Sequence, residues 1–129
     1  MQSRIFLGCL ASLISINVYA NSLNLEGIYN CKGHTPILKQ DYEGTLKIKK
    51  SGETYAFTAN YKGDESATGS GFLIDNKETG LVLIYKDSKD PNRMGVEYYK
   101  ITEHGKKLEG VWLQYQQNKL GNDNCFKKR

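Results

Sequence analysis

The sequence predicts an all-β protein, an antiparallel up-and-down meander of about eight strands that closes into a small barrel. Apolar and polar residues alternate with period two through most of the chain, and no stretch keeps helical periodicity. Short, polar, glycine-containing segments separate the alternating runs, as hairpin loops do. Proline is rare, with 2 in 129 residues. A two-sheet β-sandwich is the alternative architecture.

The first twenty residues, MQSRIFLGCLASLISINVYA, have the organisation of a signal peptide. Arg4 precedes a short apolar run, and Ala20 ends a segment that suits signal peptidase. The run is too short for a convincing membrane span. We therefore expect residues 1–20 to be removed, together with Cys9, and residues 21–129 to form one β-barrel domain. The product is expected to be periplasmic or secreted and not to span a membrane.

The first four predicted strands are LNLEGIYNC, YEGTLKIKK, TYAFTANY and TGSGFLI. The second alternates clearly, with Leu46 on one face and Lys47 and Lys49 on the other. The third places Tyr55 and Phe57 on a common face. The turns KSGE and YKGDES separate these strands. The segment KGHTPILKQD, after the first strand, reads as irregular, with room for a short 3₁₀ turn.

The last four predicted strands are GLVLIYK, GVEYYKIT, KLEGVWLQY and NCFKK. The first of them is almost uniformly apolar, and the other three alternate. The turns DNKETG and EHGKK are short and contain glycine, whereas KDSKDPNRMG is a longer connection that contains proline. Consecutive strands joined in this way form a meander.

Two cysteines, Cys31 and Cys125, remain near the two ends of the mature chain. They allow a single intramolecular pairing, which an oxidising compartment permits. The closed loop of about 95 residues predicts roughly 4–5 kcal/mol of stabilisation by chain entropy. Such a disulfide would fasten the barrel seam by joining the first strand to the last. Two unpaired buried thiols are the alternative.

The segments LEGIYN and HGKKLEGVWL resemble the Leu-x-Gly-x-aromatic strand starts of avidin-like and lipocalin-like (calycin) barrels. The spacing of GTLKI, GETYAF, GSGFL and GVEYYKI is similar to that of small exported β-barrel proteins of the Legionella type. The resemblance implies a barrel. It does not imply biotin binding, because Tyr29 and Cys31 stand where an avidin has a tryptophan and a biotin-contacting asparagine.

Catalytic and metal-binding patterns are weak in this sequence, and we expect no enzyme activity, cofactor or metal. The two histidines, His34 and His104, fall in predicted loops without a nucleophile motif. Asp87 and Asp90 lack the pattern of a calcium loop and are interpreted as turn formers. Alternation places the strand glutamates mainly on the outward face, and these are Glu26, Glu53, Glu97 and Glu109.

Large rings occur in most of the predicted strands. Because an eight-stranded barrel either fills with side chains or holds one small ligand, these rings form a packed core or line a ligand pocket. The residues assigned to the pocket or core are Tyr29, Tyr55, Phe57, Phe72, Tyr85, Tyr98 and Trp112.

Basic side chains gather in a few short stretches of the mildly basic chain, whose formal net charge is +4. They predict an anion-attracting surface for an acidic lipid, glycan or protein, or a solvated face that protects strand edges. Nucleic acid is not expected as a partner because aromatic residues do not interleave with them. The residues are Lys47, Lys49, Lys107, Lys127, Lys128 and Arg129.

The sequence therefore predicts an exported, non-catalytic binding or interaction module, monomeric or homodimeric, that meets host or envelope partners. Two alternatives remain. One is a lipocalin-like carrier of a small apolar ligand, and the other is an inhibitor or structural interaction protein with a filled core.

Overall fold

The computed structural model describes residues 23–61 and 65–129. The predicted signal peptide of residues 1–20 lies outside the described residues, as does Cys9. Among the described residues, no helix has the length and apolar character that crossing a membrane requires.

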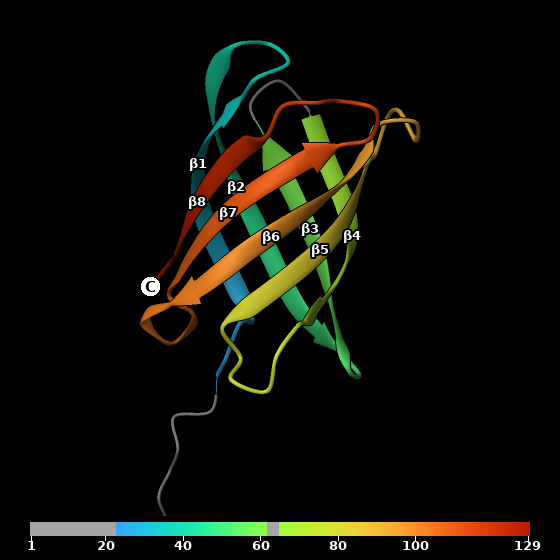
Figure 1. The fold of residues 1–129 in the computed structure, drawn as a ribbon. Helices are drawn as coiled ribbons and strands as arrows, with labels where there is room; N and C mark the ends of the chain where they lie inside the picture. Colours follow the sequence, from blue (N-terminus) through green and yellow to red (C-terminus); the bar gives the residue numbers. More distant parts are fainter. Residues whose placement is uncertain (1–22, 62–64) are drawn as a thin grey trace, which may run out of the picture.

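The described chain forms a closed eight-stranded barrel, which confirms the predicted meander and excludes the two-sheet sandwich. Neighbouring strands follow one another in sequence order, all pairs are antiparallel, and β8 returns to pair with β1 (Figure 1). A single turn of 3₁₀ helix, η1, precedes β7. The elements are β1 (Gly27–Thr35), β2 (Gln40–Ser51), β3 (Thr54–Tyr61), β4 (Glu65–Leu73), β5 (Gly80–Asp87), β6 (Met94–Thr102), η1 (Glu103–Gly105), β7 (Lys107–Gln114) and β8 (Gly121–Lys127).

The β1–β2 hairpin is longer and more regular than the sequence predicted. Strand pairing continues without a break to Thr35 opposite Gln40, and residues 36–39 form the turn. The hairpin consequently extends beyond the neighbouring strands, at the top of Figure 1 in teal. His34 lies in β1 opposite Asp41 and not in a loop, which corrects the prediction. His104 lies in η1.

Period-two alternation decides which side chains fill the barrel. In β3, Tyr55, Phe57 and Ala59 are buried and the residues between them are exposed. Because successive side chains of a strand point to opposite faces, each strand sends every second residue inward. The inward residues of the eight strands form one core cluster.

One end of the barrel is packed with apolar side chains. Leu81, Leu83 and Leu108 are fully buried there, and Leu25, which precedes β1, closes the end. The hydroxyl of Tyr29 donates to the carbonyl oxygens of Leu25 (2.8 Å) and Gly105 (2.9 Å). A buried phenol hydroxyl needs a partner of this kind, so the N-terminal segment and η1 are tied to the core. This end is called the closed half below.

The disulfide joins the first strand to the last, as predicted. Cys31 and Cys125 lie directly opposite each other in the β1–β8 register, with their Cα atoms 4.0 Å apart. Both side chains are buried inside the barrel. The bridge therefore closes the seam from within, where it also contributes to the core.

Candidate functional site

The end of the barrel opposite the closed half is hollow. A cavity of about 1290 Å³ opens there, lined by residues of β1 to β8 and of the β1–β2 turn. We call this cavity the cup. Its inner lining is aromatic and polar, and comprises Tyr42, Tyr61, Tyr85, Glu97, Trp112 and Gln114.

Glycines on neighbouring strands make room for the rings of the cup. Trp112 lies opposite Gly121 in the β7–β8 register, and a Cβ atom at position 121 would lie 2.0 Å from the indole. Tyr42 lies opposite Gly33, where a Cβ atom would lie 2.4 Å from the phenol ring. Each ring thus leans across a neighbouring strand that has no side chain at that position. The sequence positions of the glycines fix the shape of the wall.

Hydrogen bonds and ring contacts hold the wall of the cup in place. The indole N–H of Trp112 donates to the hydroxyl oxygen of Tyr42 (3.0 Å), and the Tyr42 hydroxyl donates to the carbonyl oxygen of Asn122 (3.1 Å). The rings of Tyr42 and Tyr61 meet edge to face, with centroids 5.2 Å apart. Strands β2 and β3 are therefore connected at the cup to β7 and β8, which are distant in sequence, so the wall is ordered before any ligand arrives.

Glu97 lies at the floor of the cup. Its side chain points inward from β6, opposite Trp112 on β7, and the residue is only 8% exposed. Its Oε2 atom has no hydrogen-bond partner. Burial raises the pKa of this carboxyl well above its usual range, and the Asp123 carboxyl raises it further, while a hydrogen bond with Tyr99 opposes the shift.

Asp123 is a second buried carboxyl directly behind the cup. The hydroxyl of Tyr99 donates to its Oδ2 atom, and its Oδ1 atom has no partner. Glycines flank it on both neighbouring strands, Gly110 on β7 and Gly33 on β1, which leaves space for the tyrosine rings. Burial raises the pKa of Asp123 to about 6, although hydrogen bonds from Tyr99 and Tyr42 act in the other direction.

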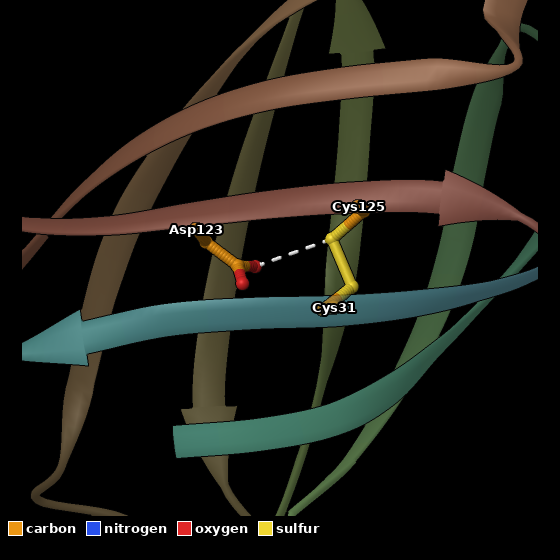
Figure 2. A group of neighbouring side chains, drawn as sticks. All are labelled: Cys31, Asp123 and Cys125. Atoms are coloured by element: carbon orange, nitrogen blue, oxygen red, sulfur yellow. Dashed lines mark hydrogen bonds between the residues drawn. A yellow bond between two sulfur atoms is a disulfide. The ribbon is translucent and has the colours of Figure 1, made fainter. Parts of the chain in front are cut away.

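Figure 2 shows Asp123 beside the disulfide. Its Oδ2 atom lies 3.5 Å from Sγ of Cys125, and these two residues with Cys31 are the group of potential metal ligands found among the described residues. Disulfide sulfurs carry no thiolate charge, so the oxidised cluster lacks the ligands that a metal such as zinc requires. The carboxyl pair of Glu97 and Asp123 is the chemically unusual feature of the site.

The structure separates the predicted pocket-or-core residues into three groups. Tyr29, Tyr55 and Phe57 are buried in the core. Tyr85 and Trp112 line the cup. The remaining two, Phe72 and Tyr98, are exposed.

Phe72 and Tyr98 were assigned inward, and this prediction is wrong, because they are 48% and 39% exposed. In β6 the inward residues are Glu97, Tyr99 and Ile101, so the prediction chose the wrong one of two adjacent tyrosines. The prediction that alternation keeps Glu97 outward is corrected for the same reason. The pair of outward Lys100 and inward Ile101 is the sequence signal that sets the correct phase.

The outer face of β4–β7 is as apolar as the core, so hydrophobicity alone does not show which side chains of these strands point inward. Apolar side chains form two cross-strand rows there, with exposed fractions up to 58% at Ile84. These outward residues are of the same apolar types as the core residues, so residue type does not distinguish outward from inward positions in these strands. The rows are Phe72–Val82–Tyr98–Val111 and Ile84–Val96–Leu113.

The predicted anion-attracting residues do not form one surface. Lys47 and Lys49 point outward from β2, as expected, and Lys128 and Arg129 are exposed. Lys127 turns inward at the closed half, where its Nζ donates to the carbonyl oxygen of Asn24 (2.8 Å), so it does not belong with the outer lysines. Lys107 is paired with Glu109 at 3.1 Å.

The aspartates of the β5–β6 connection form turns, as interpreted from the sequence. Oδ1 of Asp87 accepts from the backbone N–H groups of Lys89 (2.8 Å) and Asp90 (2.9 Å). Oδ1 of Asp90 accepts from the N–H of Asn92 (3.0 Å). These are the local side-chain bonds that favour turns.

The site residues that sequence reasoning missed are Glu97, Asp123, Tyr42 and Tyr99. The sequence contained a signal for Asp123. It is two residues from Cys125 in β8, so the two side chains point to the same face of the strand, and the predicted disulfide places that face inside the barrel. No comparable signal distinguished Glu97, since strand glutamates normally face water.

Comparison with known proteins supports the fold and nothing finer. No family model matches the chain, and no curated protein matches it. Among solved structures, the chain is similar to a redesigned β-barrel, with a TM-score of 0.69 and 9% sequence identity over 81% of this chain and 92% of that one. At this identity the similarity concerns the barrel alone.

Proposed function

We propose that this protein is an exported binding protein that holds a small organic ligand in the cup. One observation carries the proposal: an open cavity with aromatic walls that ends on a buried, incompletely hydrogen-bonded carboxyl, Glu97. Apolar cavities with a few convergent polar groups are the usual form of small-molecule sites. The calycin resemblance of the sequence belongs to the same proposal, since such barrels take ligands through their mouths.

The division of the barrel supports this function over that of an interaction protein with a filled core. The closed half already supplies a packed core, with Leu81 and Leu108 fully buried. The cup is not needed to complete that core. Buried polar groups cost stability unless they are hydrogen-bonded, and a ligand that supplies the missing hydrogen bonds would account for their presence here.

The proposed role is binding and not catalysis. The two carboxyls are surrounded by tyrosine hydroxyls and an indole, and among the described residues neither is hydrogen-bonded to a serine, a histidine or a free thiol. Export is the remaining part of the proposal, and the Cys31–Cys125 disulfide is compatible with it.

A pair of substitutions on β4 tests whether the cup binds. Ala67 faces the cup and Thr68 faces outward, so Ala67→Phe blocks the cavity and Thr68→Phe is its matched control. The oxidised protein, purified from a periplasm, is examined by native mass spectrometry with a panel of phenyl compounds that bear amine, alcohol or acid groups. We expect at least one to bind with one molecule per barrel, to be lost in Ala67→Phe and to be retained in Thr68→Phe.

Fluorescence gives an independent measurement of the same binding. Trp112 is the only tryptophan of the chain and forms part of the cup wall. Its emission should change on titration with a compound that binds. If no compound of the panel binds, or if Ala67→Phe binds as well as the parent protein, the proposed function is wrong.

A further inference from the structure

The cup combines three features that together point to one class of ligand. Its floor holds carboxyl oxygens without donors, its lining has an excess of acidic side chains, and its walls are aromatic.

One carboxyl oxygen at the floor of the cup and one directly behind it have no hydrogen-bond donor. They are Oε2 of Glu97 and Oδ1 of Asp123, and both residues are more than nine-tenths buried. A buried oxygen without a donor is costly, and the cost is recovered when a bound group supplies the missing hydrogen bond. An ammonium group carries three donors and no acceptor, which complements this floor.

Ion pairs at the mouth leave the interior of the cup acidic. The basic residues of the lining each lie beside an acid: Lys32 beside Glu43 (3.7 Å), His34 beside Asp41 (2.8 Å) and Arg93 beside Asp90 (3.7 Å). Two further acids of the lining, Asp87 and Glu97, have no ion-pair partner among the described residues. The field inside the cup therefore favours a cation.

The walls next to Glu97 suit a cation with an apolar body. Trp112 lies directly opposite Glu97, and Tyr85, which also lines the cup, lies two pairs further along the β5–β6 ladder. Burial raises the pKa of Tyr85, and the Glu97 carboxyl raises it further. Aromatic faces attract ammonium groups, and their area accommodates hydrocarbon.

We propose that the ligand of the cup is an organic amine, whose ammonium group binds the carboxylate of Glu97 while its apolar body lies against Tyr85 and Trp112. This inference rests on the proposed function, because it assumes that the cup binds a small molecule. Asp123, whose Oδ2 atom accepts a hydrogen bond from the Tyr99 hydroxyl, is a second carboxyl directly behind the cup.

Binding has a proton balance that can be measured. The titratable groups that act on Glu97 are Asp123 and Tyr99, with Tyr42 and Tyr85 close by, and none of them is cationic. These surroundings favour the protonated form of Glu97 in the free protein. When an ammonium group arrives, Glu97 ionises and its proton passes to the solvent.

The test compares two probes of nearly equal shape, 2-phenylethylamine and 2-phenylethanol. Binding is followed by calorimetry and by Trp112 emission. We expect the amine to bind about tenfold more tightly or better, since charge-assisted hydrogen bonds are stronger than neutral ones. Calorimetry in two buffers of different ionisation enthalpy should show proton release with the amine and none with the alcohol.

Glu97→Gln removes the charge and keeps the shape of the floor, and Glu109→Gln removes one negative charge from the outer face of β7 as its control. The amine preference should disappear in Glu97→Gln and persist in Glu109→Gln. Unchanged thermal unfolding of both variants shows that they are folded.

The outcomes separate the two proposals. If the alcohol binds as tightly as the amine, or if Glu97→Gln keeps the preference, the cup binds ligands and the amine inference is wrong. If neither probe binds and no compound of the broader panel binds, both the amine inference and the proposed function are wrong.

Discussion

The same strands form both halves of the barrel interior, but the two halves differ in how far their buried polar groups are hydrogen-bonded. In the closed half, Leu81 and Leu108 are fully buried and the hydroxyl of Tyr29 is satisfied by two carbonyl groups. At the floor of the cup and behind it, Glu97 and Asp123 keep oxygens without partners. The difference indicates that the packing of the closed half stabilises the fold, which allows the other end to retain buried polar groups that cost stability.

The largest effect is expected at the boundary between the halves, where the disulfide lies. Replacing both cysteines, Cys31→Ala with Cys125→Ala, should lower the free energy of unfolding by about 4–5 kcal/mol, because the bridge closes almost the whole chain. Urea denaturation of the variant and the oxidised parent measures the difference. Reduction of the parent serves as a second comparison. A loss below about 1 kcal/mol would contradict the role of the seam.

A matched pair of truncations compares the halves directly. Leu81→Ala removes a fully buried side chain of the closed half and should cost about 2–5 kcal/mol. Gln114→Ala removes a side chain of the cup lining and should cost less than about 0.5 kcal/mol. Denaturation with the same probe checks both variants. Equal losses would mean that the two halves contribute alike to the core.

A smaller effect concerns the pH dependence of stability. Asp123 has a folded-state pKa of about 6, above its ordinary value of 3.8, so the folded protein binds the proton more tightly than the unfolded chain does. The resulting stabilisation is complete below about pH 4 and is lost as the pH rises through about 6. Glu97, whose pKa is also raised, extends the loss to higher pH.

The measurement is the difference in unfolding free energy between the parent and Asp123→Asn across this range. The parent should lose about 2–3 kcal/mol relative to the variant between pH 4 and pH 7. A parent protein that instead gains stability relative to Asp123→Asn as the pH rises would show that Asp123 is stabilised in its ionised form.

The barrel and its seam were predictable because they depend on patterns that extend over many residues. Period two recurs in most of the eight predicted strands, and only one pairing was possible for Cys31 and Cys125. An error in a single strand does not change the predicted barrel or disulfide. The choice of which alternate residues point inward is different, because it is decided within one strand. In β6, Tyr98 and Tyr99 are adjacent and chemically identical, so only their neighbours Lys100 and Ile101 distinguish inside from outside.

The floor of the cup could not be predicted by the same reasoning. Patterning rules assign a strand carboxylate to the surface because burial of a charge is expensive. Glu97 and Asp123 violate that rule, and they do so where register brings four strands together around Gly33 and Gly110. This convergence exists only in the closed barrel, so it is not visible in any one segment of the sequence.

The seam disulfide also makes the folded domain a covalent ring. The main chain from Cys31 to Cys125, with the bridge, passes through every connection between consecutive strands. A single cut in any hairpin turn at the mouth of the cup therefore leaves one molecule, whose pieces separate only after reduction. A protease can therefore open a turn of the barrel without releasing either end of it.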